Sequence, residues 1–395
     1  MQIYRTGKDE SIYDIARKYE VSPIKIAEDN ALEIRGRLPM GREVLVRTPS
    51  RTYNVRVGDT LDRIALRFKT TKEALMRLNP ELEGREKIYS GQLLTVKDAS
   101  PSYGMISTNG YLYSGTPRDR LIAAIPYLSY VTVASAIYKG SHVHSLYPSD
   151  DTVSFIKGRG RAPMLRVYMT ELPKEDKDFA DSIAILAKSG GFSGITLSSL
   201  NSLSGDAQRL SSLTLTARRA LIENDLLLFV EGDADGPLSY MEYADAGILI
   251  YDKLHKSDIP SFNDGELAVY TEFAGSCECC RAFIEISSFA YSGGGYIDKG
   301  EALRIIDRKC ADILNDTDKK LQRGVYGRRK RREVLYESLE NTKAKLEAVS
   351  ELGFMGISFD IGRICTPDLM AMASMFDIVG SPVMMPKNAS ERQEM

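Results

Sequence analysis

The chain has 395 residues, too many for one ordinary domain and suited to two or three. Its 52 basic and 54 acidic side chains nearly balance, which argues against a nucleic-acid-binding protein, and 43% hydrophobic residues exclude a globally disordered chain. No apolar run approaches the roughly 18 residues of a membrane span. The first five residues lead directly into patterned sequence, so we expect neither a membrane segment nor a secretory leader.

The first hundred residues contain a repeat. The aligned segments are 11–19 with 60–68, and 41–46 with 91–96. Each copy predicts a strand, two helices and a strand, because Ser11 and Thr60 are N-cap residues that precede an apolar stripe at helical spacing. The second helix of each copy is expected to end at Asn30 and Asn79, residues that tolerate the left-handed C-cap conformation.

This pattern resembles the LysM module, which is marked by a Gly-Asp-Thr-Leu opening and an Asn that closes the second helix. The second copy has that opening at 58–61, whereas the first has Asp9 in place of the glycine. The resemblance implies βααβ modules at 1–48 and 51–97 that bind glycans containing N-acetylglucosamine, such as peptidoglycan or chitin. The implied groove residues are Gly58, Asp59, Thr60, Asn79 and Pro80. Modules that only hold the protein in an assembly are the alternative.

A barrel is predicted in the remaining chain. Residues 98–104 are polar and small and indicate a linker, and the tail at 384–395 is expected to be flexible. Between them, eight short apolar runs alternate with helical stretches, which predicts an eight-stranded α/β barrel over 105–383. The runs are 110–113, 130–137, 164–169, 194–198, 226–230, 246–251, 282–287 and 356–359. A doubly wound open sheet would require a glycine-rich turn after its first strand, and that turn is missing.

The order of these runs is similar to the glycoside hydrolase family 18 barrel, and above all to LysM-bearing N-acetylglucosaminidases that act on spore cortex peptidoglycan. Residues 109–113 resemble that group's first strand, 121–136 its first helix and second strand, and 340–359 its last helix and strand. The resemblance implies a (β/α)8 barrel of the TIM type and a chitinase-like activity. A long helix is also expected over 333–352, with Tyr336 on its buried side.

The catalytic motif of that family is degenerate here. In the family, the acetamido group of the sugar is the nucleophile and a glutamic acid after the fourth strand protonates the leaving oxygen. The signature Asp-x-x-Asp-x-Asp-x-Glu aligns with 193–200. Its acids are replaced by Ser193, Thr196, Ser198 and Leu200. Leu200 cannot donate a proton, and Asp360 replaces the Trp that forms the floor for the sugar. The resemblance therefore implies a barrel that has lost family 18 hydrolysis.

Three interpretations of the barrel stay open. It is a glycan-binding or structural scaffold, in which Tyr251 keeps the family's contact with the acetamido group. Alternatively, other acids at the catalytic face of the barrel supply hydrolysis or hold a cation, although such acids are more often solvated or cap helices. These acids are Glu231, Asp233, Asp252 and Asp360. In the third interpretation the alignment is shifted and the acid lies elsewhere.

The remaining polar clusters give no site. The run 319–332 holds eight basic side chains and no acid, which fits a solvated hairpin or a grip on an anionic polymer. Cys277, Cys279 and Cys280 lack the second pair that zinc requires, and His142, His144 and His255 are scattered. We expect no metal and no cofactor.

The sequence thus predicts a two-module glycan-binding protein with a chitinase-like barrel that is inactive, made in the cytoplasm and deposited at the spore cortex or coat. Its expected partners are peptidoglycan or a chitin-like polymer, and spore coat or cortex proteins, with neither nucleic acid nor membrane. A glycoside hydrolase with relocated carboxylates is the alternative.

Overall fold

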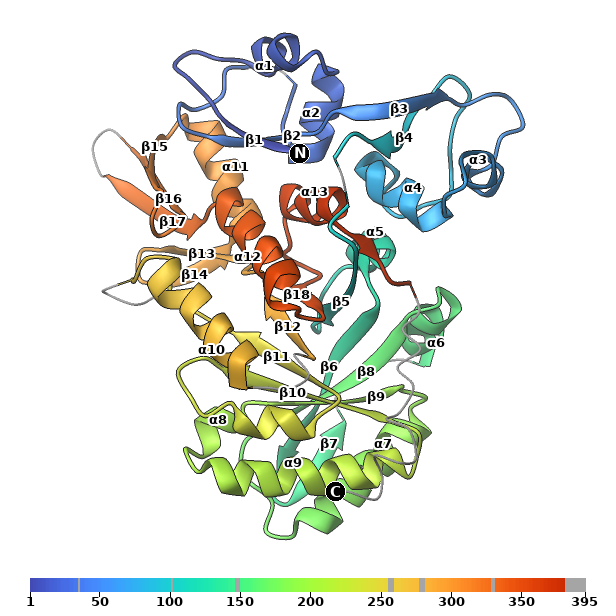
Figure 1. The fold of residues 1–395 in the computed structure, drawn as a ribbon, viewed down its shortest axis with the longest axis vertical. Helices are drawn as coiled ribbons and strands as arrows, with labels where there is room; N and C mark the ends of the chain where they lie inside the picture. Colours follow the sequence, from blue (N-terminus) through green and yellow to red (C-terminus); the bar gives the residue numbers. More distant parts are fainter. Residues whose placement is uncertain are drawn as a thin grey trace.

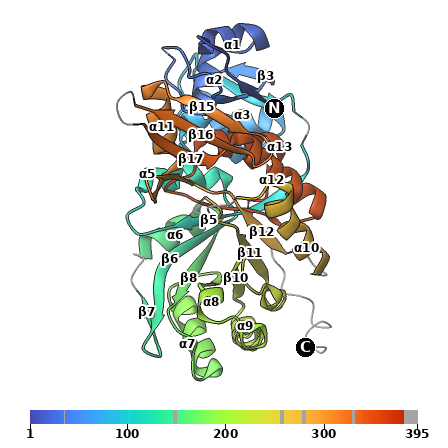
Figure 2. The same ribbon diagram turned by 90° about the vertical axis from the view of Figure 1, so that its left-hand side faces the viewer.

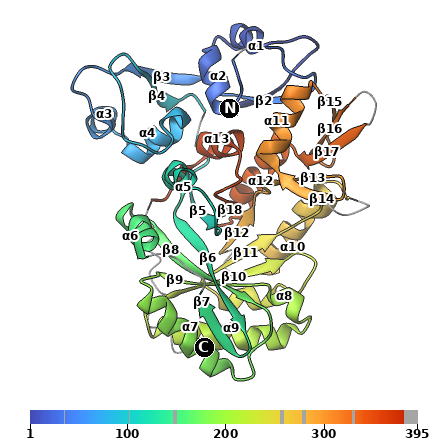
Figure 3. The ribbon, with the colours of Figure 1, turned by 180° about the vertical axis from the view of Figure 1, so that it is seen from behind.

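The computed structural model describes residues 1–34, 36–100, 102–145, 150–254, 259–276, 281–327 and 331–380. The cluster 277–280, His255, residues 328–330 of the basic run and the tail at 384–395 lie outside these ranges. Two small modules lie side by side at one end of the molecule, the barrel lies at the other end, and an inserted sheet lies between module 1 and the barrel (Figures 1 and 3).

Both modules have the predicted order of elements. Module 1 consists of β1 (Gln2–Arg5), α1 (Ile12–Tyr19), α2 (Pro23–Asn30) and β2 (Glu43–Val46). Module 2 consists of β3 (Pro49–Asn54), α3 (Leu61–Phe68), α4 (Lys72–Leu78), the 3₁₀ helix η1 (Pro80–Leu82) and β4 (Leu93–Asp98). In each module the two strands pair antiparallel. Ser11 and Thr60 are the N-caps of α1 and α3 as predicted, and each side chain accepts a backbone N–H of the first turn.

Neither Asn30 nor Asn79 is a left-handed C-cap, contrary to the prediction. Ala31 takes that conformation after α2 with φ of 50°, and Asn79 has φ of −130°. Both asparagines are buried, and their amides join the end of the second helix to the closing strand. Asn30 exchanges two hydrogen bonds with the backbone of Leu45, at 2.7 and 2.8 Å, and Asn79 exchanges the same two with Thr95, both at 2.8 Å. The repeated Asn is therefore a structural residue in both modules.

Eight parallel strands form a closed barrel, which confirms the predicted fold class. The strands are β5 (Met105–Leu112), β6 (Tyr130–Lys139), β8 (Ala162–Met169), β9 (Gly194–Ser198), β10 (Leu227–Asp233), β11 (Ala246–Ile250), β12 (Ala282–Glu285) and β18 (Gly356–Asp360). Each pairs with the next in this order, and β18 pairs with β5 to close the barrel. Every predicted apolar run overlaps one of these strands.

Helices cover the outside of the barrel (Figure 1). They are α5 (Arg118–Ala124), α6 (Asp150–Gly158), α7 (Asp176–Ser189), α8 (Leu200–Leu203), α9 (Ala207–Ile222), α10 (Ala268–Ser276), α12 (Leu339–Leu352) and α13 (Thr366–Met375). The connection from β10 to β11 has only the 3₁₀ helix η3 (Ser239–Tyr243). Two short helices and two short strands lie beside the barrel: the 3₁₀ helix η2 (Ile125–Tyr127), the π helix η4 (Asn263–Leu267), β7 (His142–Ser145) and β19 (Asp377–Ile378).

An antiparallel five-stranded sheet is inserted between β12 and α12 (Figure 2). Its strands are β13 (Phe289–Ser292), β14 (Gly295–Asp298), β15 (Asp312–Asp316), β16 (Leu321–Tyr326) and β17 (Arg332–Glu337). The helix α11 (Lys299–Lys309) connects β14 to β15. Tyr336, predicted to lie on a helix, lies in β17, and α12 begins only after the N-cap Ser338. Because β17 pairs with β13 on one side and β16 on the other, these pairings override the helical spacing. β16 and β17 form the hairpin predicted for the basic run.

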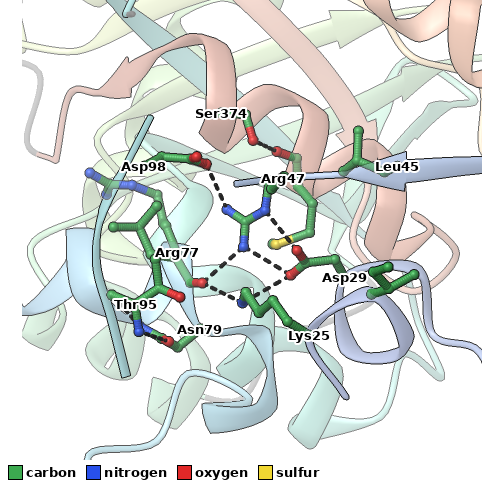
Figure 4. Close-up of polar contacts among 12 residues, drawn as sticks. Lys25, Asp29, Leu45, Arg47, Arg77, Asn79, Thr95, Asp98 and Ser374 are labelled. Carbon is green, nitrogen blue, oxygen red and sulfur yellow. Dashed lines mark hydrogen bonds and ion pairs between the residues drawn. The ribbon is translucent and has the colours of Figure 1, made fainter. Parts of the chain in front are cut away.

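The modules and the barrel meet around Arg47, which follows β2 (Figure 4). Its guanidinium bonds both carboxylate oxygens of Asp29 at 2.8 and 2.9 Å and the carbonyl of Leu78 at the end of α4, and it lies 3.5 Å from Asp98. The helix α13 of the barrel packs against α2, β2 and α4 at the same place. Burial disfavours the charge of Arg47, but Asp29 outweighs this cost and raises the pKa of Arg47 above its usual value.

The predicted linker is held against the rest of the chain. The N–H of Ala99 donates to the carbonyl of Thr48, and the N–H of Tyr103 donates to the carbonyl of Met375. The linker is therefore tied at one end to the segment between the modules and at the other end to α13 of the barrel.

Replacing Arg47 by Met should lower the free energy of unfolding by about 1.5–3 kcal/mol, because buried Asp29 loses both hydrogen bonds from the guanidinium and keeps only Lys25, 3.0 Å away. Urea unfolding measures this loss. Arg37→Met is the matched control, since the Arg37–Asp9 pair is exposed and its removal should change stability by less than about 1 kcal/mol. Equal stability of the two variants would contradict this role of Arg47.

Candidate functional site: the barrel mouth and the module grooves

Side chains alternate between the two faces of a strand, so each barrel strand sends every second residue into the barrel. At the carboxyl ends of the strands this alternation places five polar residues in or near the mouth. They are Tyr111 on β5, Arg166 on β8, Glu231 on β10, Glu285 on β12 and Asp360 on β18. Aromatic rings fill the barrel below them, where Tyr130, Phe229 and Phe283 pack edge to face or tilted.

Glu231 is bound by two partners from across the barrel. Arg166 Nε and Nη2 donate to its two carboxylate oxygens at 2.7 and 2.9 Å, and the Tyr111 hydroxyl donates to Oε1 at 2.9 Å. Burial opposes the charge of Arg166, but Glu231 outweighs it and raises the pKa of Arg166. The three side chains come from β5, β8 and β10 and tie these strands together. Both carboxylate oxygens of Glu231 are thus occupied by its ion pair with Arg166.

The residues that replace the family acids make only neutral polar contacts or apolar ones. Thr196 lies 3.3 Å from Thr132, whose hydroxyl donates to Asn109 at 2.8 Å, within the barrel. Ser198 donates to the carbonyl of Val167, and Leu200 is fully buried in the apolar shell between strands and helices. Ser193 is partly buried just before β9. No carboxylate stands at any of these four positions.

The other acids expected at the mouth also have partners. Asp360 accepts the N–H of Gly362 at 2.8 Å and pairs with Arg363 at 2.6 Å, so it closes the turn that follows β18. Asp252 is exposed and accepts the hydroxyl of Tyr296, from the inserted sheet, at 2.6 Å. Asp233 is exposed at the end of β10. A Cβ at Gly265 would lie 2.9 Å from the Tyr251 hydroxyl, so the Tyr251 side chain packs against the turn at Gly265.

Glu285, which the sequence analysis did not single out, is the mouth carboxyl with a perturbed proton affinity. Burial raises the pKa of Glu285 to about 8, and the negative charge of Glu231 acts in the same direction. Lys345 opposes the shift, but it also pairs with Glu337 and with Glu266 at 2.9 and 3.0 Å. Glu285 is therefore protonated at neutral pH. The signal was available, because Glu285 stands two residues after the inward-facing Phe283 at the end of a strand.

The opening turns of the two modules have the same geometry despite their different sequences. Asp9 takes a positive φ of 61° where Gly58 has 86°, a conformation that Asp tolerates better than most residues. In module 2 the Asp59 carboxylate accepts the Tyr53 hydroxyl and the N–H of Arg56, both at 2.8 Å. These bonds hold the pKa of Asp59 below its usual value.

Module 1 has the same pair of hydrogen bonds in its opening turn, with Glu10 in place of Asp59. The Glu10 carboxylate accepts the Tyr4 hydroxyl and the N–H of Gly7. Asp59, like the buried Asn79, therefore has a structural task inside its module, whereas Gly58 and Thr60 are exposed at the surface. The acidic residue of the opening turn is maintained in both copies because it holds the turn.

Pro80 is half-buried where module 2 meets the barrel. With Glu81, Glu83 and Arg85 it lines a cavity of ≈ 350 Å³ between module 2, α2 and the barrel helices α5 and α13. A Cβ at Gly84 would lie 2.0 Å from the carbonyl oxygen of Ile122, so this loop packs closely on α5. The second-helix side of the expected groove is thus shared with the barrel.

The described residues contain neither a metal-binding cluster nor a membrane-spanning helix. No group of three or more His, Cys, Asp or Glu side chains there has the geometry to hold a metal ion. None of the helices in the described ranges is long and apolar enough to cross a membrane.

Known proteins resemble both the modules and the barrel of this chain. The LysM domain family matches residues 4–47 and 53–97. Residues 4–47 and 53–97 are LysM domains. A Bacillus licheniformis protein named as L,D-transpeptidase YkuD is 35% identical over 79 residues, which are 19% of this chain and 47% of that protein. The chain thus spans about half the length of this curated relative.

The barrel has a chitinase-like fold. The whole structure is similar to the spore cortex-lytic enzyme SleL of Bacillus megaterium, with a TM-score of 0.73 and 17% identity over 96% of this chain and 99% of SleL. A chitinase of Chromobacterium violaceum gives a TM-score of 0.56 and 18% identity over 68% of this chain and 98% of the chitinase. At these identities the likeness establishes the fold, the two LysM modules followed by the closed barrel.

Protonated Glu285 makes stability depend on pH. Its pKa lies above the ordinary value of 4.5, so the folded state holds more protons and loses stability as pH rises from about 4.5 to about 8. Glu285→Gln should remove this loss, so the variant gains stability relative to the wild type between pH 5 and 8. Urea unfolding at pH 5, 6.5 and 8 measures it, with Glu333→Gln, an exposed acid, as control. Parallel pH profiles of wild type and Glu285→Gln would contradict the shift.

Proposed function

We propose that this protein binds polymers that contain N-acetylglucosamine, peptidoglycan or a chitin-like glycan, through its LysM modules. Its barrel serves as a glycan-binding or structural scaffold and does not hydrolyse glycosidic bonds. The LysM match and the chitinase-like fold support the choice of glycan. The proposed contact residues are Gly58 and Thr60 on the opening turn, Pro80 on the second-helix loop, and Tyr251 at the barrel mouth.

The proposed loss of hydrolysis rests on what stands at two positions of the barrel. The position of the expected proton donor is held by Leu200, which is buried in the apolar shell, and the inward-facing Glu231 has both oxygens bound by Arg166. A general acid has to carry a proton within hydrogen-bond reach of the leaving oxygen, and removing it costs about 10²–10⁴-fold in rate. Neither residue meets that requirement.

The proposed setting is the spore. A structure that resembles this chain over nearly its full length is named as a spore cortex-lytic enzyme, and the cortex is the natural location for a protein with the same architecture. Spore coat or cortex proteins are proposed as further partners.

The purified chain should sediment with insoluble peptidoglycan and be released by soluble N-acetylglucosamine oligomers, because the acetamido-bearing sugar is the recognised unit. Cellulose, which has no acetamido group, is the control polymer and should retain at most about a tenth as much protein. Equal retention on cellulose and peptidoglycan, or retention that the oligomers do not reverse, would contradict specific glycan binding.

A glycoside hydrolase with a relocated acid is the second candidate function, and Glu285 favours it. A carboxylic acid that remains protonated at neutral pH at the end of a barrel strand is placed where this fold carries its catalytic residues. Under this candidate, Glu231 and Asp360 orient the acid or the sugar.

If reducing ends are released from peptidoglycan, Glu285→Gln should lower the rate by about 10²–10⁴-fold, because the amide cannot protonate the leaving oxygen. Glu333→Gln, an exposed acid of the inserted sheet, should leave the rate unchanged. Activity that survives Glu285→Gln assigns the proton to another group, and Glu231→Gln and Asp360→Asn then identify it.

A further inference from the structure

The closing strands of the two LysM modules have diverged in what they contact. In module 1 every residue of β2 is buried, whereas β4 of module 2 begins and ends with exposed or partly exposed residues. The aligned residues are Arg42 with Gln92, Glu43 with Leu93, and Leu45 with Thr95. Leu45 belongs to the main apolar core of the barrel, and Ile3 of β1 packs against that core. Module 1 therefore contributes side chains to the barrel itself.

Polar contacts also bind module 1 to the inserted sheet. Arg42 pairs with Asp307 of α11 at 3.1 Å, and Gln322 of β16 donates to the carbonyl of Gly41 at 3.0 Å. Both Arg42 and Gln322 are buried. These bonds fix the turn before β2 against the inserted sheet.

Glu43 caps a helix of the barrel. Its Oε2 accepts the N–H of Leu339 at 2.7 Å, at the first residue of α12, and its Oε1 pairs with Arg5 at 3.1 Å. A carboxylate at a helix N-terminus binds free N–H groups and favours the helix dipole. Because the Glu43 side chain is only 1% exposed, this cap is part of the folded interior. The aligned Leu93 of module 2 is 52% exposed and supplies no such group.

The two loops that border the groove are joined in module 1. The N–H of Leu38 donates to the carbonyl of Glu10 at 2.8 Å, and Ser11 and Arg37 form a β-bridge. Leu38 and Pro39 are buried as a result. The groove of module 1 is thereby closed by its own backbone.

In module 2 the same loops remain apart. All of 51–100 is described, and within it no hydrogen bond joins 86–90 to 57–60. Val57 on one loop is 91% exposed and Tyr89 on the other is 60% exposed. Module 2 thus presents apolar side chains on two separate loops, a surface on which a sugar ring can stack.

We propose that the two LysM modules have different tasks: of the two modules only module 2 contacts the glycan, and module 1 is a structural part of the barrel. This inference rests on the proposed glycan binding and states which module performs it. The contacts of Glu43, Arg42 and Leu45 with the barrel and the inserted sheet support the structural role of module 1. The open loops of module 2 support its contact with the glycan.

Matched surface variants of the full chain test the division. Val57→Asp with Tyr89→Ala alters the loops of module 2, and Lys8→Asp with Met40→Ala alters the corresponding loops of module 1. All four side chains are exposed, so both variants should fold, which circular dichroism checks. Retention on insoluble peptidoglycan should fall at least about tenfold for the module 2 variant and stay within about twofold of the wild type for the module 1 variant.

Three other outcomes overturn the proposal. Equal losses in both variants show that both modules bind and leave the proposed function standing, and a loss confined to the module 1 variant reverses the assignment. A wild-type chain that is not retained at all ends the proposed function and this inference together.

The structural task of module 1 has its own measurement. Glu43→Gln should lower the melting temperature by about 2–4 °C, because α12 loses its charged cap, while retention on peptidoglycan below the melting temperature stays at the wild-type level. Leu93→Gln, at the aligned position of module 2, should leave the melting temperature unchanged. An unchanged melting temperature in Glu43→Gln would overturn the structural task.

Discussion

A guanidinium group with no access to water has to be paired, and this requirement at Arg47 fixes how the two modules sit against each other. Arg47 and Asp29 come from module 1, the carbonyl of Leu78 and Asp98 come from module 2, and α13 of the barrel packs against α2, β2 and α4 at this place (Figure 4). Moving module 2 away would take the Leu78 carbonyl and Asp98 from Arg47 and would uncover the contact with α13. The modules therefore form one unit with the barrel, and the surfaces they expose are determined by that docking.

The same requirement acts inside the barrel. Arg166 and Glu231 form an ion pair across the mouth, and the Tyr111 hydroxyl donates to Glu231. The Glu231 carboxylate therefore joins three strands of the barrel. The positions that the sequence analysis aligned with the family acids carry Ser193, Thr196, Ser198 and Leu200. Of the other acids described at the mouth, Asp252 and Asp360 have polar partners, Asp233 is exposed, and burial raises the pKa of Glu285. This arrangement is the basis on which we propose a scaffold and not a hydrolase.

Local patterns in the sequence were sufficient for much of the fold. The caps Ser11 and Thr60 predicted the modules, and the eight short apolar runs that alternate with helical stretches predicted the barrel. These local patterns could not predict contacts between residues that are distant in the sequence. Tyr336 lies in a strand because β13 and β16 pair with its segment, and Arg166 meets a glutamate 65 residues away. The bonds that Asn79 and Asp59 make inside module 2 also leave no trace in the local sequence.

The central claim is that a chitinase-like barrel has here become part of a glycan-binding protein without keeping its chemistry. Mass spectrometry of the soluble fraction, after days of incubation of the purified chain with peptidoglycan, tests this claim most directly. The account predicts bound protein in the pellet and no new soluble saccharides with N-acetylglucosamine at their reducing ends. Steady release of such fragments at an ordinary turnover rate would contradict it.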